Sequence, residues 1–284
     1  MGERRIVVVT DSAAYIPEEA LGGLRVPVIP LWLIWDNERF RDGVDIDPPT
    51  FYRRLRKSGT VPTSSQPSAG EFVDFFRQVS AEADAIVGVI ASARMSGTLA
   101  SAQAAQARLP ELTIRLVDSM SMSMGMGFVA LAAARAAAAG RSLDEVVAAA
   151  EAVRDRAHFL FAVETLEYLR RGGRIGGAKW LLGTALKIKP LLEFRDGQIE
   201  AVAQIRTKRK ALAHMLDIAE ERLGGKRMAE VAVPDVDSPE EGDAVAEQVR
   251  ERFGVARVYR CTVSPVVGTH AGPGTVGLAF YAEP

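Results

Sequence analysis

Three continuous, mostly β-branched apolar runs constrain this chain more than any other feature. They cover residues 6–10, 85–90 and 113–117, and Asp, Ser or Thr follows each run within two residues. Runs of this kind are typical of strands buried on both faces of a parallel sheet. The carboxyl ends of such strands share one edge of the sheet, where ligands bind. The pattern therefore predicts an α/β sheet with a hydroxyl-rich site on one rim.

Helical patterns alternate with these runs, which favours a parallel sheet with helices on its faces. In the first half we expect an edge strand or bulge within 26–35 and a turn at 36–38. We expect helices at 48–57, 68–80, 99–107 and 141–156, and one more helix that follows the methionines at 120–126 and ends at Gly140. In the second half we expect strands at 159–163, 229–233, 255–263 and 278–282, a hairpin of 188–194 with 199–206, and helices at 166–175, 179–186, 208–223 and 239–253. The composition changes near residue 157, so we predict two α/β domains, residues 1–157 and 158–284. The first has a mainly parallel sheet flanked by helices, and the second has a mixed sheet with helices.

A hydroxyl-rich stretch, Thr63 to Ser68, precedes the helix at 68–80. Ser68, followed three residues later by Glu71, has the spacing of a capping box and marks where that helix begins. The hydroxyls before the cap are therefore expected in an extended loop at the mouth of an α/β unit. Such a loop offers O–H and N–H groups to a ligand.

Composition excludes several classes of function. With a net charge of −1 the chain has no basic surplus for phosphates, so we expect no nucleic-acid partner. A single cysteine, Cys261, and three scattered histidines argue against a disulfide framework and a metal site, and fit a cytoplasmic protein. No apolar run approaches the ~20 residues of a membrane span, and the N-terminus lacks the pattern of a signal peptide. We expect no cofactor and no membrane insertion.

Two other functions stay open at this point: nucleotide binding and catalysis by a serine with a histidine. The stretch Gly125 to Ala130 matches G-x-G-x-x-A, but it lies too far from the preceding strand for a dinucleotide fingerprint. His270, in a glycine-flanked segment expected to be a loop, could join a serine in a hydrolase or transferase acting on an ester or phosphate. The serines available for such a pair, or for an anion-binding cradle, are Ser64, Ser92, Ser96 and Ser119.

The assembled motifs resemble the DegV family of bacterial fatty-acid-binding proteins. The matching segments, in order along nearly the whole chain, are 9–12 (VTDS), 64–68 (SSQPS), 96–98 (SGT) with 101–102 (SA), 117–119 (VDS), 124–125 (MG), 166–175 (LEYLRRGGRI), 188–190 (IKP) and 269–274 (THAGPG). Each segment alone is a weak signal, but the ordered set is specific.

The resemblance implies a non-enzymatic carrier that holds one long-chain fatty acid in a tunnel between its two domains and presents it to a fatty-acid kinase. It places the carboxylate of the ligand at Ser64, Ser92, Thr269 and His270. Ser64 replaces the threonine usual at its position, and Ala93 stands where the family has a second serine. We expect further pocket residues at Thr10, Ser12, Ser119, Met120, Met124, Gly125 and Gly272. The same resemblance places the contact with the kinase at Arg170, Arg171 and Arg174.

The physical demands of such a ligand agree with this set of residues. A buried methylene contributes about 0.8 kcal/mol, so a chain of about 16 carbons yields on the order of 10 kcal/mol before the costs of binding. A carboxylate is costly to bury unless it is hydrogen-bonded, and hydroxyls, glycine-loop N–H groups and a histidine can supply those bonds.

Overall fold

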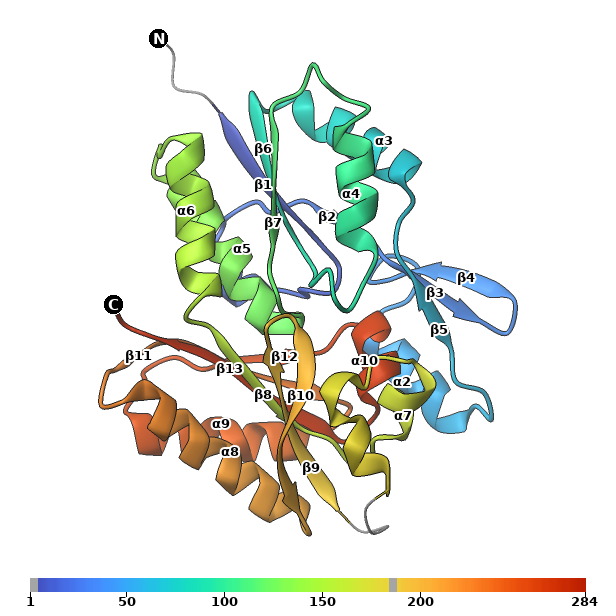
Figure 1. The fold of residues 1–284 in the computed structure, drawn as a ribbon, viewed down its shortest axis with the longest axis vertical. Helices are drawn as coiled ribbons and strands as arrows, with labels where there is room; N and C mark the ends of the chain where they lie inside the picture. Colours follow the sequence, from blue (N-terminus) through green and yellow to red (C-terminus); the bar gives the residue numbers. More distant parts are fainter. Residues whose placement is uncertain (1–4, 184–187) are drawn as a thin grey trace.

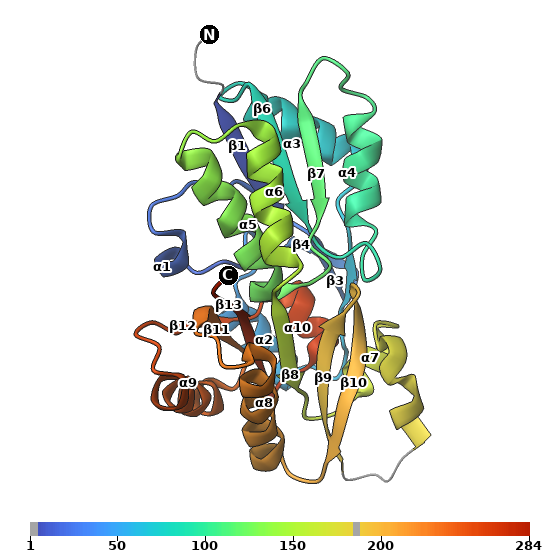
Figure 2. The same ribbon diagram turned by 60° about the vertical axis from the view of Figure 1, so that its left-hand side comes forward.

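The structure is a computed structural model that describes residues 5–183 and 188–284. Figures 1 and 2 show two stacked sheets, each with helices, and a smaller sheet beside the junction between them. This mixed α/β architecture confirms the predicted fold class.

The first sheet is fully parallel and has the strand order β2-β1-β6-β7. Its strands are β1 (Ile6–Asp11), β2 (Val28–Ile29), β6 (Ala85–Ile90) and β7 (Ile114–Asp118). All six residues of β6 are buried, as its uninterrupted apolar run requires of a strand covered on both faces. The apolar runs at 6–10, 85–90 and 113–117 are therefore the adjacent strands β1, β6 and β7, and the polar residues at their carboxyl ends share one rim of the sheet.

The second sheet is mixed and has the order β10-β9-β8-β13-β11-β12. Its strands are β8 (His158–Ala162), β9 (Lys189–Arg195), β10 (Gln198–Ile205), β11 (Met228–Val236), β12 (Tyr259–Thr262) and β13 (Thr275–Ala282). Only β11 and β12 run parallel. The β9–β10 turn contains Asp196 and Gly197 at positive φ, which confirms the Asp-Gly hairpin.

A small antiparallel sheet carries the hydroxyl-rich stretch. Its order is β4-β3-β5, with β3 (Trp32–Trp35), β4 (Glu38–Arg41) and β5 (Thr63–Ser65). The expected turn joins β3 and β4. Part of the expected loop is therefore a strand, since Ser64 pairs with Leu33 of β3. The backbone of this stretch is held by a neighbour rather than free.

Helices cover the sheets, and two of them begin at the predicted caps. They are α1 (Glu18–Leu21), α2 (Pro48–Lys57), α3 (Ala69–Ser80), α4 (Thr98–Gln106), α5 (Ser123–Ala138), α6 (Leu143–Arg154), α7 (Glu167–Arg171), the 3-10 helix η1 (Gly176–Gly183), α8 (Lys208–Leu223), α9 (Pro239–Phe253) and α10 (Pro265–Ala271). Capping boxes begin α3 at Ser68 with Glu71 and α6 at Ser142 with Glu145. Helices α8 and α9 lie on the outer side of the mixed sheet (Figure 1).

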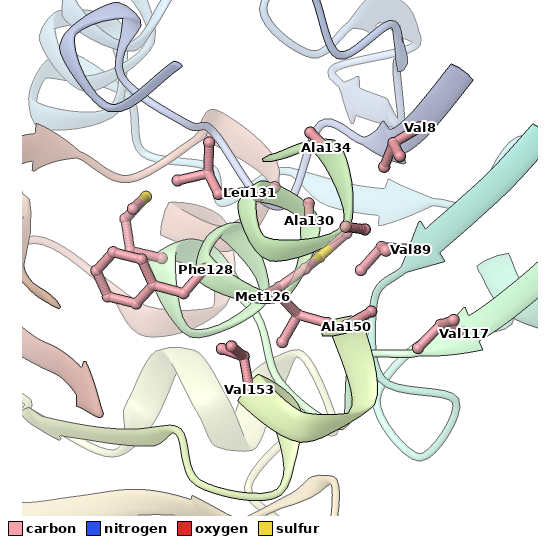
Figure 3. Close-up of a cluster of buried hydrophobic side chains, with 14 of the residues drawn as sticks. Val8, Val89, Val117, Met126, Phe128, Ala130, Leu131, Ala134, Ala150 and Val153 are labelled. Atoms are coloured by element: carbon pink, nitrogen blue, oxygen red, sulfur yellow. The ribbon is translucent and has the colours of Figure 1, made fainter. Parts of the chain in front are cut away.

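Helix α5 packs between the two large sheets. It contacts β1 and β6 of the parallel sheet and β8, β11 and β13 of the mixed sheet. Its alanines and glycines keep it thin, and eleven of its residues are buried. Figure 3 shows Met126 and Ala130 of α5 on the side of Val89 and Ala150, while Phe128 lies on the other side of the helix, where it packs on Tyr259 and Tyr281 of the mixed sheet. The apolar core is therefore continuous from one sheet to the other.

Three expectations differ from the structure. His270 lies in α10, although its glycine-flanked segment was expected to be a loop. The strand expected over 255–263 is confined to β12. The helix expected over 179–186 is the 3-10 helix η1 as far as Gly183, and the rest of that expectation lies outside the described residues. In η1 the two glycines at its start oppose a regular α-helix, because glycine is a poor helix former.

Candidate functional site

An apolar cavity lies where the two large sheets and the small sheet meet. Its atom-free space is about 730 Å³ with open solvent included, and water-sized molecules can occupy about 70 Å³ of it. Most of its wall is apolar, and those residues are Leu31, Met95, Met122, Phe159, Phe161, Leu169, Phe194, Ile199, Pro234, Val236, Val263, Val266, Val267 and Ala271. Both halves of the chain contribute. A cavity of this character suits a hydrocarbon chain better than a sugar or a nucleotide.

The polar part of this wall centres on Ser64 and His270. The Ser64 hydroxyl and His270 Nε2 are 2.7 Å apart, a hydrogen bond in which the tautomer of the ring decides the donor. Ser64 is placed by the pairing of β5 with β3, and His270 by α10. Arg174, Ser96, Ser123 and Thr275 are the other polar residues of the wall. The structure thus brings Ser64 and His270 together, and their role in holding a carboxylate stays a prediction.

His270 is half-buried. Burial, with a smaller contribution from nearby Arg174, lowers the pKa of its imidazole to about 4. Its Nδ1 has no hydrogen-bond partner among the described residues, and the same holds for the buried hydroxyl of Thr269, one residue earlier. The ring packs on Gly172 so closely that a Cβ there would lie 2.0 Å from Nδ1. The site therefore holds unsatisfied polar atoms, which a bound group with a donor or acceptor could satisfy.

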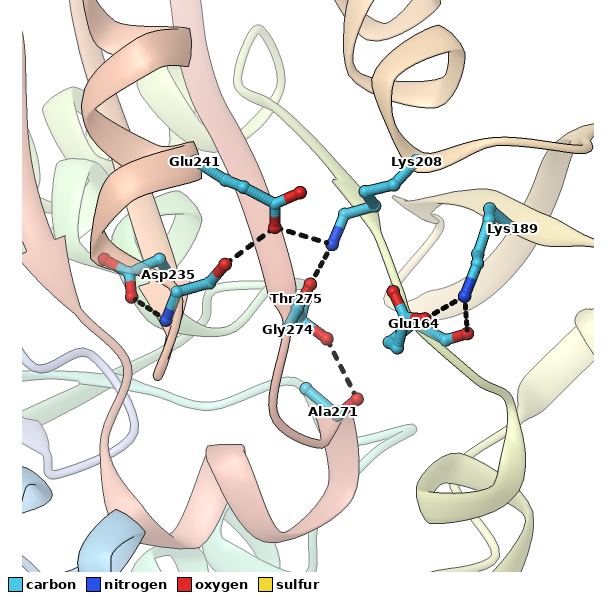
Figure 4. Close-up of polar contacts among 9 residues, drawn as sticks. Glu164, Lys189, Lys208, Asp235, Glu241, Ala271, Gly274 and Thr275 are labelled. Carbon is cyan, nitrogen blue, oxygen red and sulfur yellow. Dashed lines mark hydrogen bonds and ion pairs between the residues drawn. The ribbon is translucent and has the colours of Figure 1, made fainter. Parts of the chain in front are cut away.

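Helix α10 is anchored beyond both of its ends. Before it, the Tyr52 hydroxyl donates to the carbonyl of Val263 at 2.8 Å. After it, the Thr275 hydroxyl donates to the carbonyl of Ala271, and the Lys208 ammonium donates to the carbonyl of Gly274 and pairs with Glu241 (Figure 4). The position of His270 is therefore fixed by side chains from both halves of the chain.

The hydroxyls on the rim of the parallel sheet are mostly occupied by bonds within the protein. Thr10 donates to the carbonyl of Val89, Ser12 to Asp42, and Ser119 to the carbonyl of Ser121. Ser92 is fully buried, and its hydroxyl donates to the carbonyl of Gly197 at 2.5 Å. In this structure Ser92 and Ser119 do not line the apolar cavity, while Thr10 and Ser12 line a separate one. A role for Ser92 and Thr269 in holding a carboxylate stays a prediction.

The methionine stripe contributes one side chain to the wall, Met122. Met120 has positive φ and is 37% exposed, while Met124 is fully buried in the core around α5. Gly125 is also inside α5, where a Cβ would meet the Ser121 hydroxyl at 2.2 Å. Neither Met120, Met124 nor Gly125 lines the cavity. Of the four methionines that alternate with small residues at 120–126, Met122 is the one whose side chain reaches the wall of the cavity.

Sequence reasoning did not single out the aromatic part of the wall. Phe159 and Phe161 are two residues apart on β8, a spacing that places both on the same face of the sheet. Phe194 of β9 lies against both rings. The alternation in Phe159-Leu160-Phe161 was visible in the sequence, but nothing local to it indicates that this face meets a cavity rather than a helix.

The arginines expected to contact a kinase occupy two environments. Arg170 and Arg171 are exposed on α7, and both pair with Glu167. Arg174 is half-buried at the wall of the cavity, where it donates to the carbonyl of Gly172 at 2.7 Å. Gly272 has positive φ and faces the Tyr168 ring, and it does not line the cavity. The three arginines therefore extend from the surface of α7 to the cavity.

The positions of the glycines do not favour the nucleotide alternative. Gly125 and Gly127 lie within α5 rather than in a turn between a strand and a helix. A Cβ on Gly127 would meet Met124 Sδ at 2.8 Å, so these glycines permit close helix packing.

The described residues offer no alternative centre for metal chemistry. Across residues 5–183 and 188–284, no three side chains of His, Cys, Asp or Glu gather as ligands for an ion. Within the same ranges, no helix combines the length and the apolar character that crossing a bilayer requires.

The pH dependence of stability should report the neutral state of His270. Because its pKa falls from 6.5 to about 4 on folding, the unfolded chain binds a proton between these values that the folded chain does not. The free energy of unfolding therefore decreases as the pH falls through this window. His270→Gln should make the slope shallower by up to about 1.4 kcal/mol per pH unit near pH 5. Urea unfolding of both proteins at several pH values measures this, and identical slopes would contradict it.

Comparison with known proteins identifies the family of this chain and solved structures with the same fold. The family described as "Uncharacterised protein, DegV family" matches residues 5–283. A DegV domain-containing protein of Streptomyces coelicolor is 38% identical over 282 residues, 99% of each chain. The structure of a fatty-acid-binding DegV family protein from Thermus thermophilus has a TM-score of 0.92 at 33% identity, covering 98% of this chain and all of that one. DegV from Bacillus subtilis, a fatty acid binding protein, has a TM-score of 0.90 at 31% identity, with 99% and 100% covered.

The stacked parallel and mixed sheets, with an apolar cavity at their junction, define a class of two-sheet α/β proteins that includes these solved structures. Within that class the chain belongs to the DegV family. The resemblance predicted from its ordered motifs is confirmed.

Proposed function

We propose that this protein binds one long-chain fatty acid, with the hydrocarbon tail in the apolar cavity and the carboxylate at Ser64 and His270. The observation that carries the proposal is an aromatic and aliphatic wall with a single Ser–His pair among its few polar groups. The related proteins from Thermus thermophilus and Bacillus subtilis bind fatty acids, which supports the same ligand here.

The two parts of the ligand meet matching parts of the cavity. The tail leaves water for side chains such as Phe159, Phe161 and Ile199, which contributes about 0.8 kcal/mol for each buried methylene. The carboxylate accepts a hydrogen bond from the Ser64 hydroxyl, with the Arg174 guanidinium nearby. If Nε2–H donates to Ser64, the serine proton is free to face the ligand. The head group is then hydrogen-bonded although it is buried.

The second part of the proposal is that the bound acid is presented to a fatty-acid kinase. Arg170 and Arg171 lie on the surface of α7, and Arg174 connects that region to the cavity, so a partner docked on α7 would reach the carboxylate. Acyl phosphate should form when the loaded protein is incubated with such a kinase and ATP. Its absence, with a kinase active on another carrier, would remove this part of the proposal and leave fatty-acid binding intact.

Catalysis by Ser64 and His270 is the competing function, because their 2.7 Å contact resembles half of a triad. Two features favour the carrier. No carboxylate orients Nδ1 of His270 in the described part of the chain, and a pKa near 4 makes the imidazole a weak base. Ester and phosphoester turnover that disappears in both Ser64→Ala and His270→Ala would instead support the hydrolase or transferase.

Mass spectrometry tests the binding proposal directly. Protein purified from cells and extracted with solvent should yield about one fatty acid per chain, since this cavity has a single polar end. Protein that yields no lipid and gains no affinity for added fatty acids would overturn the proposal.

The effect of Ser64 should be specific to its own side chain. Ser64→Ala should weaken fatty-acid binding about 10- to 100-fold, because a hydrogen bond to a charged group contributes about 1.5–3 kcal/mol. Ser65→Ala is the matched control, since Ser65 points to the carbonyl of Gln66 and does not line the cavity. Titration of a fluorescent fatty acid measures both. Equal losses in the two variants would show that the strand, and not the Ser64 hydroxyl, matters.

A further inference from the structure

A buried carboxylate outside the cavity connects the two segments that carry Ser64 and His270. Asp42 follows β4 and is 2% exposed. No lysine, arginine or histidine forms an ion pair with it within the described ranges, and the titratable groups that face it are Asp11, Tyr15 and Tyr52. Three donors from two parts of the chain converge on its two oxygens. A buried acid with this arrangement is costly to keep, so its contacts indicate what it does.

One set of contacts leads to Ser64. The Ser12 hydroxyl donates to Asp42 at 2.7 Å and accepts from the backbone N–H of Leu31 at 3.0 Å. The N–H of Asp42 in turn donates to the carbonyl of Leu31 at 2.9 Å. Leu31 directly precedes β3, the strand on which β5 and Ser64 are paired. Asp42 therefore fixes the start of the strand that positions Ser64.

The other set leads to His270. Asp42 accepts from the backbone N–H of Val266 at 3.4 Å and from the hydroxyl of Ser264. Ser264 is the N-cap of α10, and Val266 is in its first turn. This helix is only seven residues long, so a constraint at its start is transmitted to His270 in its last turn.

We propose that Asp42 is a positioning residue that sets the distance between Ser64 and His270, and so the geometry of the head-group site. A carboxylate can accept from all three donors at once. An asparagine has a single acceptor oxygen, and its NH₂ group would face a donor. Removal of the charge by Asp42→Asn therefore breaks at least one of the two connections while it preserves the shape of the side chain. The consequence for the ligand rests on the proposed function; the geometry of the Ser64–His270 pair does not.

The test reads His270 directly in the protein without ligand. Burial raises the pKa of Asp42 to about 7, so ¹⁵N-NMR spectra are recorded at pH 8, where its carboxylate is charged, and the three histidines are few enough to assign with His270→Gln. We expect the ¹⁵N shifts of the wild-type His270 ring to report the hydrogen bond of Nε2 with Ser64, and we expect Asp42→Asn to change them as that contact is lost. The charge control is Asp11→Asn. Asp11 is equally buried, but its oxygens accept from the N–H groups of Ala13 and Ala91 and not from α10.

Ligand affinity provides the second measurement. Asp42→Asn should weaken binding of a fatty acid about tenfold, and should weaken the fatty alcohol of the same length by less than about twofold, since only the head group is displaced. General destabilisation would weaken both ligands alike. Ser12→Ala gives a second variant, because Ser12 does not touch α10 and reaches it only through Asp42, while its other bond, from the N–H of Leu31, lies on the Ser64 side. It serves as the deciding variant if Asp42→Asn does not fold.

The outcomes separate the two proposals. Changed ¹⁵N shifts of His270 at pH 8 in Asp42→Asn and Ser12→Ala, but not in Asp11→Asn, support the positioning role. Unchanged shifts in the first two variants, or the same change in all three, overturn it. If the wild-type protein binds no fatty acid, the proposed function fails, and the ¹⁵N spectra of His270 still decide the role of Asp42.

Discussion

Replacing Gly172 with alanine should weaken fatty-acid binding by tenfold or more and, because a packed ring is displaced, should also lower the free energy of unfolding by about 1–3 kcal/mol. Gly172 ends α7 with φ near −73°, a conformation that alanine adopts without strain. The added Cβ would, however, lie 2.0 Å from Nδ1 and 2.8 Å from Cε1 of His270. A ring cannot absorb such contacts, so it must leave its position beside Ser64. Titration with a fluorescent fatty acid measures the loss.

Gly173→Ala is the matched control for this prediction. Gly173 lies in the same turn, and a Cβ there meets no atom within 4 Å. Its φ of +70° makes alanine unfavourable by about 1–2 kcal/mol, which should appear in the free energy of unfolding and not in affinity. The reverse pattern, with normal binding in Gly172→Ala, would show that His270 does not need its present position.

The second large effect concerns the contact between α5 and the mixed sheet. Glu230 of β11 accepts two hydrogen bonds from Arg135 of α5, at 2.6 and 2.8 Å, and one from the Tyr281 hydroxyl at 2.6 Å. Burial would raise the pKa of Glu230, but these bonds outweigh it and hold the pKa below its ordinary value. Glu230→Ala should lower the free energy of unfolding by about 3 kcal/mol, since it leaves partly buried donors unpaired. Urea denaturation measures the difference.

An exposed ion pair gives the comparison for this effect. Glu247→Ala removes the pair with Arg250 on the surface of α9, and we expect a change of no more than about 0.5 kcal/mol. A double-mutant cycle of Glu230→Ala with Arg135→Ala then isolates their coupling. A coupling free energy near zero would show that α5 is held to the mixed sheet by apolar packing alone.

Sequence patterns predicted those parts of the fold that local chemistry determines. The runs that became β1, β6 and β7 are apolar because helices cover both faces of their sheet, so burial left a direct signal. Ser68 and Ser142 were legible as helix starts because a capping box involves only four consecutive residues. Helix α10 carried a similar signal, Ser264 followed by Pro265, but the glycines after it favoured a loop.

Features set by distant contacts could not be read in the same way. The pairing of Ser64 with Leu33 depends on a strand about thirty residues away, so a hydroxyl-rich strand was expected to be a loop. The choice of Met122 over Met120 and Met124 depends on where the chain turns into α5. The rim hydroxyls were expected to face a ligand, but several are used by partners such as Asp42 and Gly197. Composition shows that hydroxyls are present, and the tertiary fold decides what they bind.

Ser64 and His270 are separated by 206 positions along the chain, yet they share one hydrogen bond. No fragment that lacks either segment can form the proposed head-group site, so that site is a property of the completed fold. During synthesis the pair comes into existence only after α10 has been made and has packed against β5. Since a ligand of such a site favours the folded state alone, occupancy and resistance to unfolding rise together, by about 2.7 kcal/mol at a free ligand concentration 100 times Kd. The cell's supply of ligand would thereby govern how long the protein survives as well as what it carries.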